Sequence, residues 1–457
     1  MPSFLIFFVH RHFEFRYPEL YALYTIQNLC CDTLLGDINS LPDPIQSPVL
    51  RVQLPSIEAA KFLSERGILI KGIYEVWGAV EPTDPTESPT YAQLASSIQV
   101  SLSPDKLAIL ENPQTSWRLN VEAFGKKLSM KEQERIRSEV SPIVPFKGPV
   151  QMKNASETFL VLEEVDISVE NATLENPKRL YFLRQLAGSE RNRGRGGARD
   201  LIDIQTLKRR AYIGPTSMES EIALLMCNMA LVRQNDVVMD PFIGTGSVLI
   251  PCANYGALCF GGDIDFRVLL GTAVGVSGSI PPKERTRFQR KLKLSEAQAS
   301  NTNGRDQKRV NVVSNFEQYG LPLPEIIRAD NSHSPMWEHC SGFFDAIICD
   351  PPYGIRAGAR KTGRQGPKRA VDGTRNDYKD PYIIPTQPYG PEDVMKDLLE
   401  FSARTLRVGG RLVYLFPTII GESNLIPRHP KLRLLFMSEQ RITSKYARLL
   451  LTMEKVV

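Results

Sequence analysis

The sequence predicts an α/β protein, with a doubly wound parallel sheet in the second part of the chain and an α+β region before it. The first observation is that, from Tyr212 onward, apolar runs of strand length alternate with helical patterns, as in βαβ units. The second is that several of these runs end in aspartate. Ligands of open α/β sheets bind beyond the carboxyl ends of the strands, so this edge is the candidate functional edge.

The first part of the chain, residues 1–185, mixes strands and helices without the βαβ order. The spacing of apolar residues distinguishes the two kinds of element, and Gly67 is a helix stop signal. The predicted strands lie at 4–11, 49–55 and 73–81, and the predicted helices at 19–30 and 57–67. This mixture predicts an α+β domain.

A basic, glycine-rich stretch, ERNRGRGGARD (190–200), follows that domain. Its composition cannot bury a core, so we predict a linker over residues 186–211. Tracts of this kind can also contact RNA, but a solvated linker is the preferred interpretation. The second domain is then expected at residues 212–457, with an insertion at 281–309.

The second domain is expected to contain a Rossmann-like sheet with helices between its strands. The predicted helices are 217–232, for which Ser217 is the expected cap, 244–256 and 391–410. The predicted strands are 236–240, 257–265, 325–330, 344–350 and 411–417, followed by an antiparallel pair at 431–440 and 448–457.

Composition excludes several classes of protein. An apolar fraction of 42% and a charged fraction of 23% over 457 residues are typical of a globular chain. The net charge of +5 is too small to indicate a polyanionic partner by itself. The seven cysteines include no C-x-x-C pair, which indicates a reducing compartment and no metal site. With no signal peptide and no membrane-spanning run evident, we expect a soluble, cytoplasmic protein without a membrane partner.

The stretch DPFIGTGSVL (240–249) predicts a cofactor site. A phosphate-binding loop would need Gly-Lys-Ser/Thr, which is absent, and a dinucleotide fingerprint would need glycine where Leu249 stands. An acid ahead of the glycines, Asp240, suits a ligand that carries a positive amino group. S-adenosylmethionine meets that demand with its amino acid, sulfonium and adenosine groups.

Two further strand ends support the same cofactor. Asp263 is placed to hold ribose hydroxyls, and Asp330 to accept from the adenine amino group. Each acid alone could cap a helix, but acids at successive strand ends are hard to explain as packing. The expected cofactor-binding residues are Thr216, Asp240, Pro241, Phe242, Gly244, Thr245, Gly246, Asp263, Ile264, Asp330 and Asn331.

The run Asp350-Pro351-Pro352-Tyr353 predicts the catalytic turn. Two prolines forbid helix and ladder, so the chain turns sharply at the strand end. The Asp350 carboxylate and the Pro351 carbonyl can accept hydrogen bonds from an exocyclic ring amine, which makes its nitrogen more nucleophilic. Tyr353 offers a flat face for a base to stack on. Taken alone, the four residues could also be an ordinary strand-ending turn.

Basic side chains follow the catalytic turn closely. They are Arg356, Arg360, Lys361, Arg364 and Lys368. A solvated loop is the ordinary interpretation of such a run. Beside an active-site mouth, contacts with RNA phosphates are the favoured interpretation.

Several runs together resemble the family of the catalytic subunit of the eukaryotic tRNA guanosine-10 N2-methyltransferase. They are HFEFRYPEL, RAYIGPTSMESE, DPFIGTGSVL, GGDID, FDAIICDPPYGIRAGARKTG, GGRLVYLFP and LLLTMEKV, which are spread over nearly the whole chain. DPFIGTGS and DPPY are shared with many amino-methyltransferases, whereas the YIG-x-TSM run and PYG-x-R-x-GARKTG are narrower.

This resemblance implies a class I methyltransferase domain that follows a ferredoxin-like and THUMP-type RNA-binding region. It implies Asp350 as the catalytic acid, S-adenosylmethionine as cofactor and the N2 amine of guanosine 10 in tRNA as acceptor. It also implies a small zinc-binding activator subunit. Two other possibilities stay open: an amino-methyltransferase acting on another nucleobase or a glutamine, and a catalytically silent RNA-binding scaffold.

Overall fold

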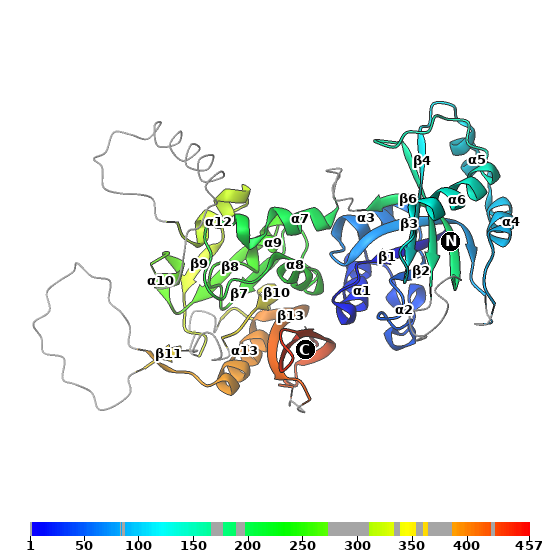
Figure 1. Cartoon of the computed structure of the whole chain (residues 1–457). Coiled ribbons are helices and arrows are strands. Elements are labelled where there is room, and N and C mark those ends of the chain that lie inside the picture. Colours follow the sequence, from blue (N-terminus) through cyan, green and yellow to red (C-terminus); the bar gives the residue numbers. More distant parts are fainter. Residues whose placement is uncertain are drawn as a thin grey trace, which may run out of the picture. The chain divides into compact units, whose positions relative to one another are not determined.

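The structure is a computed structural model that divides the chain into two compact units, Met1–Asp200 and Leu201–Val457 (Figure 1). It describes residues 2–82, 84, 87–165, 177–188, 197–272, 310–332, 339–352, 360–363, 386–421 and 426–457. The boundary between the two units along the chain falls within the predicted linker, residues 186–211. The division of the chain into domains and linker remains a proposal.

The first unit is built on a six-stranded sheet in the order β2-β1-β3-β6-β5-β4. Neighbouring strands are antiparallel except β4 and β5, which are parallel. The strands are β1 (Ser3–Phe8), β2 (Val49–Gln53), β3 (Ile70–Val80), β4 (Trp117–Phe124), β5 (Glu157–Glu164) and β6 (Arg179–Gly188). The strands predicted from the sequence correspond to β1, β2 and β3.

Helices of the first unit begin at the caps that the sequence offers. Ser56 accepts from the backbone of α3, and Thr90 and Ser129 form capping boxes with α4 and α6. The helices are α1 (Arg16–Ile26), α2 (Cys31–Leu34), α3 (Ile57–Arg66), α4 (Tyr91–Ser101), α5 (Pro104–Glu111) and α6 (Met130–Val140), with 3-10 turns η1 (Phe13–Phe15), η2 (Ile38–Ser40) and η3 (Ser141–Ile143).

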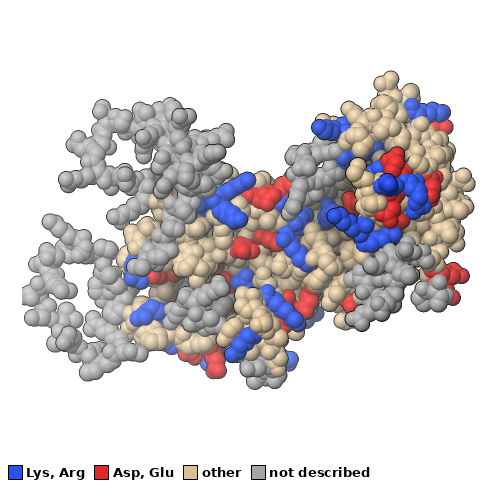
Figure 2. Space-filling model, viewed as in Figure 1, with Lys and Arg blue, Asp and Glu red and all other residues tan. Residues whose placement is uncertain are grey.

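Aromatic side chains fill the core of the first unit. Trp77 is fully buried and its ring meets Phe159 at 5.2 Å, while Phe159 stacks on Phe182 at 5.5 Å. The surface of the unit carries both signs of charge, and lysine, arginine and acidic side chains are interspersed on the face that Figure 2 shows. The charged side chains of this unit therefore form no large patch of a single sign on that face.

The second unit is built on a seven-stranded sheet in the order β14-β15-β13-β10-β7-β8-β9. Strands β13, β10, β7, β8 and β9 are parallel, and β15 is antiparallel to both β13 and β14. The strands are β7 (Val237–Asp240), β8 (Leu258–Asp263), β9 (Glu325–Arg328), β10 (Phe344–Cys349), β13 (Leu406–Ile419), β14 (Leu432–Arg441) and β15 (Tyr446–Lys455). The predicted doubly wound sheet and its antiparallel pair are confirmed.

The strand order reverses between β7 and β10, because the chain builds outward to β9 on one side and later returns to the other. Such a switch point opens a crevice at the carboxyl ends of the two strands. The remaining elements are α7 (Ala198–Ile204), η4 (Leu207–Arg209), α8 (Ser220–Met229), α9 (Leu249–Asn254), α10 (Phe266–Leu269), α12 (Val312–Tyr319), α13 (Pro391–Thr405) and the hairpin strands β11 (Arg360–Thr362) and β12 (Thr386–Pro388).

The predicted start of α8 and the predicted end of α13 are wrong. Ser217 is not the cap of α8, which begins at Ser220 with Glu219 in the cap position. Helix α13 ends at Thr405, before the predicted glycine pair, because β13 begins at once and Leu406 pairs with Phe344 of β10. The glycines instead lie at an irregularity of β13, where Gly409 has a φ of +80°.

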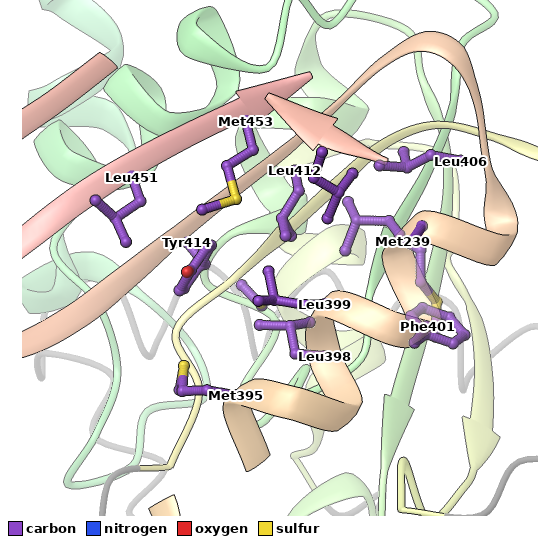
Figure 3. Packing of buried hydrophobic residues seen from close by; sticks show 14 of the residues in the cluster. Met239, Met395, Leu398, Leu399, Phe401, Leu406, Leu412, Tyr414, Leu451 and Met453 are labelled. Carbon is purple, nitrogen blue, oxygen red and sulfur yellow. The ribbon is translucent and has the colours of Figure 1, made fainter. Parts of the chain in front are cut away.

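Helix α13 covers one face of the sheet around its centre. Figure 3 shows Leu398 and Leu399 of the helix facing Leu412 and Tyr414 of β13, with Met453 of β15 beside them. All five side chains are buried. This packing fixes the positions of the central strands, and with them the residues at the strand ends. Within the described ranges, no helix is both long and apolar enough to cross a membrane.

Candidate active site

The switch point brings two of the predicted acids together. Asp240 ends β7, and Asp350 follows β10, whose residue Ile347 pairs with Met239 of β7. Asp240 is 2% exposed. Burial raises the pKa of its carboxyl well above the ordinary value, and the charges of Asp263 and Asp350 raise it further. A cationic group of a ligand would favour the ionised form of Asp240 and be bound by it.

The glycine turn (240–247) leads the chain away from β7. Gly244 and Gly246 have φ values of +50° and +80°, which side chains other than glycine rarely adopt. A Cβ on Gly246 would lie 3.0 Å from the side chain of Val312. The Asp240 carboxylate accepts from the amide of Phe242 at 2.9 Å. Helix α9 begins only at Leu249, later than predicted, so the glycines form an open turn and not the first turn of the helix.

Asp263, at the end of β8, is tied to this turn. One carboxylate oxygen accepts from the amide of Gly244 at 3.0 Å, and the other from the amide of Asp265 at 2.9 Å. Burial raises the pKa of Asp263 to about 6, although these hydrogen bonds act in the opposite direction. Ile264 follows it, half-buried. The predicted ribose-binding carboxylate therefore lies directly against the glycine turn.

The end of β9 carries Asp330 and Asn331. The Asp330 carboxylate accepts from Ser332 through one oxygen and from both the amide and the hydroxyl of Thr362 through the other. Burial acts to raise the pKa of Asp330, but these hydrogen bonds outweigh it and lower the pKa. The Asn331 amide nitrogen donates to the carbonyl of Pro241. Among the described residues, no hydrogen-bond partner faces the buried Oδ1 of Asn331, which leaves an acceptor for a ligand.

A network of hydroxyl groups holds the segment before α8 on the glycine turn. Ser217 Oγ lies 2.7 Å from Thr245 Oγ1, and Arg210, which is fully buried, donates to Ser247 at 2.7 Å. The predicted residue Thr216 is exposed beside Ser217. The contacts of Arg210, Ser217 and Ser247 were not predicted from the sequence. Only Ser217 lies within the YIG-x-TSM run, which was the available signal.

The turn predicted to be catalytic leaves the Asp350 side chain 25% exposed, and the buried Pro351 and the half-buried Pro352 follow it. Arg448 of β15 forms an ion pair with Asp350, with 3.6 Å between Nη1 and Oδ2. Nothing in the sequence pattern indicated Arg448. The predicted residue Tyr353 lies outside the described residues.

The predicted RNA-binding residues are only partly described. Arg360 on β11 donates to the hydroxyl and carbonyl of Thr386 on β12 at 2.5 and 2.9 Å. Lys361 lies 3.6 Å from a carboxylate oxygen of Asp393 and 5.1 Å from the ring centre of Tyr389. Exposed pairs of this kind are worth less than about 1 kcal/mol, so a phosphate can replace them. The other predicted residues, Arg356, Arg364 and Lys368, lie outside the described residues.

Within the part of the chain that the structure describes, no three histidine, cysteine or acidic side chains are grouped as metal ligands would be. The seven cysteines are free thiols, and burial raises the pKa of Cys349 beside the site and of Cys252 and Cys259 further away. These cysteines are therefore packed as small apolar residues.

Comparison with known families agrees with this site. Residues 2–191 match the family described as the Tmrp11 THUMP N-terminal domain, and residues 208–365 match the RMKL-like methyltransferase domain. Fold and site together define a methyltransferase with a THUMP-containing first part, and the fold class predicted from the sequence is confirmed.

Curated relatives cover almost the whole chain. The chain is 32% identical to the tRNA (guanine(10)-N(2))-methyltransferase TRMT11 of Homo sapiens over 99% of its own length and 88% of the relative's. The identity and both coverages are the same for the relative from Pongo abelii. The relative from Dictyostelium discoideum is 32% identical over 100% of this chain and 83% of its own length. The chain belongs to the TRMT11 family of tRNA (guanine(10)-N(2))-methyltransferases. Among solved structures, TrmN from Thermus thermophilus is 14% identical, with a TM-score of 0.42 and coverage of 99% and 100% of the two chains.

Proposed function

We propose that this protein transfers a methyl group from S-adenosylmethionine to the N2 amine of guanosine 10 in tRNA. The observation that carries the proposal is the Asp350-Pro351-Pro352 turn at the switch point. It follows a strand that pairs with β7, and the charge of Asp350 raises the pKa of the buried Asp240 at the end of β7. Membership of the TRMT11 family supports the choice of substrate.

The residues at the strand ends fit S-adenosylmethionine. A Cβ on Gly244 would meet only the carbonyl oxygen of Phe242, at 3.8 Å, so a ligand can approach the backbone there, and the buried Oδ1 of Asn331 is an acceptor for a ligand's donor group. Asp240 would hold the ligand's amino group and Asp263 its ribose hydroxyls. Both carboxyls have raised pKa values, mainly because of burial, so a ligand that supplies a positive charge or hydroxyl donors would stabilise their ionised forms.

Asp350 and the Pro351 carbonyl act on the acceptor amine. By accepting its N–H hydrogens they hold the nitrogen towards the cofactor side of the crevice and oppose delocalisation of its lone pair into the ring. When bound, S-adenosylmethionine would supply an electrophilic methyl group: the amine lone pair would form the new N–C bond, the S–C electron pair would stay on sulfur, and the proton that the amine loses would pass to the Asp350 carboxylate and from there to solvent. The protein also accelerates the reaction by holding the acceptor amine and the methyl group in a reactive orientation.

Binding of tRNA is assigned to the THUMP-containing first unit and to the basic residues after the catalytic turn. Arg360→Ala with Lys361→Ala should weaken tRNA binding and make it less dependent on salt, because each lost phosphate contact reduces the log–log salt slope by about 1. Binding isotherms from low to high salt measure this. Arg433→Ala, which removes an exposed cation from β14, is the matched control. An unchanged slope in the double variant would make these residues ordinary solvated surface.

The proposed activator subunit has a candidate surface on the methyltransferase unit. Strand β9 is an edge of the described sheet, and large apolar side chains at or just before the starts of parallel strands are exposed: Leu258 of β8 at 54%, Leu323 before β9 at 56% and Phe343 before β10 at 45%. Solvated apolar side chains grouped at a sheet edge favour a protein partner. We propose that a small zinc-binding activator covers this edge, and that the complex is cytoplasmic.

Labelled S-adenosylmethionine and unmodified tRNA, with and without the activator, test the proposal. Nucleoside analysis should find N2-methylguanosine, and a tRNA with adenosine at position 10 should accept no label. The activator should increase the yield if the partner is correct. Label in another base or in protein would change the substrate class. An absence of product with wild-type protein that binds cofactor would favour a silent RNA-binding scaffold.

A further inference from the structure

We propose that Arg448 is a positioning residue for methyl transfer, which keeps the Asp350 carboxylate ionised and fixes its orientation at the catalytic turn. The inference rests on the proposed function, because it concerns the group that accepts the substrate amine. Arg448 lies on β15, far along the chain from the catalytic turn, and belongs to none of the motifs that predicted the site.

The sheet register carries Arg448 to the site. Arg448 is paired with Pro417 of β13, near the carboxyl end of the parallel strands, and its side chain reaches across β13 towards the turn after β10. Its Nη1 lies 3.6 Å from Asp350 Oδ2, and its Nε donates to Gln440 Oε1 on β14 at 2.7 Å. The guanidinium is thus fixed between a neutral amide on one side and the catalytic carboxylate on the other.

Both partners of this ion pair are largely screened from solvent. The side chains of Arg448 and Asp350 are 21% and 25% exposed. The hydrogen bond to Gln440 holds the Arg448 side chain, so its positive charge stays within ion-pair distance of Asp350 Oδ2 and favours one orientation of the carboxylate. An exposed pair would give neither a fixed geometry nor a strong field.

A cation favours the ionised form of Asp350 beside the other carboxyl groups of the site. Asp240 of β7 interacts electrostatically with both Asp350 and Asp263, and bound cofactor would stabilise the negative forms of Asp240 and Asp263. Negative neighbours and partial burial favour the protonated form of a carboxyl group, and a protonated Asp350 could no longer accept from a substrate N–H through both oxygens. Arg448 supplies the opposing charge from β15.

The other elements packed here contribute neutral groups. On β10 itself, burial raises the pKa of Cys349, and on β13 burial raises the pKa of the Tyr414 hydroxyl above its ordinary value. On β14 the neighbouring group is the amide of Gln440, beyond which Glu439 is paired with Arg441 at 2.8 Å. None of these groups replaces the charge of Arg448 on Asp350.

The test compares Arg448→Gln and Arg448→Lys with wild type in single-turnover methyl transfer to tRNA from pH 5 to pH 9. Arg448→Gln should be slower by up to about tenfold on the acidic limb of its pH profile, and this limb should move to higher pH by about one unit, since each unit is a tenfold change in ionisation. Activity should therefore recover in part at alkaline pH. Arg448→Lys keeps the charge and should show a smaller loss with a smaller shift.

Arg433→Gln is the matched control, because it removes the cation of an exposed β14–β15 ion pair, with Glu454, at the opposite end of the two strands. Its rate and pH profile should equal those of wild type. Dissociation constants for cofactor and tRNA should stay within about threefold of wild type in every variant. Thermal melting of each variant identifies a loss of fold.

Three outcomes would overturn the inference. If Arg448→Gln weakens tRNA binding while the single-turnover rate is kept, Arg448 is an RNA contact. If its rate falls equally at all pH values and lysine gives no rescue, the residue serves packing. If rate and profile are unchanged, Asp350 needs no cation. A wild-type protein that makes no N2-methylguanosine would instead contradict the proposed function, so the two failures are distinguishable.

Discussion

Replacing Asp350 with alanine should lower the single-turnover rate of methyl transfer by about 10²-fold to 10³-fold, the usual effect of removing one transition-state acceptor or donor. Cofactor and tRNA binding should change little, because Asp350 is not one of the proposed cofactor-binding or RNA-binding residues and is expected to contact only the acceptor amine. The carboxylate matters most when the amine nitrogen becomes tetrahedral and positive. Rapid mixing of enzyme, labelled cofactor and tRNA measures the rate, and filter binding measures the two affinities.

The control for this prediction is Glu392→Ala, which removes an exposed carboxylate from the first turn of α13. It should retain the wild-type rate. Asp350→Asn should be nearly as slow as Asp350→Ala, since an amide presents one acceptor oxygen and a donor group. A rate within about threefold of wild type in both Asp350 variants would remove this residue from the mechanism.

The second large effect concerns Asp263 and the cofactor. Asp263→Ala should weaken S-adenosylmethionine binding by about 10²-fold, equivalent to about 2.7 kcal/mol, because the ribose loses its acceptor and the glycine turn loses its tie to β8. In the wild-type protein, cofactor affinity should also depend on pH. The pKa of Asp263 is about 6, so protonation of this carboxylate should lower the affinity by up to about tenfold per unit below that pH.

Calorimetry from pH 5 to pH 8 measures both effects. Asp263→Asn is the companion variant, because it keeps the shape of the side chain but cannot ionise. Its affinity should be low and should lack the pH dependence centred near pH 6, so any dependence that remains belongs to Asp240. A wild-type affinity that does not change between pH 5 and pH 8 would show that the ionised Asp263 carboxylate does not hold the cofactor.

Local sequence pattern located the strand ends well. Asp240, Asp263, Asp330 and Asp350 each follow an apolar run, and an acid at the end of a buried parallel strand can be recognised from a few residues. The parallel order of these strands follows from the helices between them, so the pattern also predicted that the acids share one edge. The role of each acid in binding or catalysis remains a prediction.

Contacts between distant segments could not be predicted in the same way. The ion pair of Arg448 with Asp350 depends on the register of β15 against β13, and a shift of one residue would place Arg448 on the other face of the sheet. Thr362 on Asp330 is a similar case, because Thr362 lies on β11, which pairs with the distant strand β12. Ser217 looked like a helix cap, but its hydroxyl is engaged by Thr245 in a segment far along the chain.

Strand β15 lies between β13 and β14, although it follows both of them in the chain. During synthesis, β14 leaves the ribosome before the strand that joins it to the rest of the sheet, so it must wait unpaired until β15 arrives. The same strand brings Arg448 to Asp350. The parallel strands that carry Asp240 and Asp263 can therefore form before β15 is made, whereas the positive charge opposite Asp350 arrives only with β15. If Arg448 acts as proposed, the pairing of β15 and the ability to transfer a methyl group would coincide.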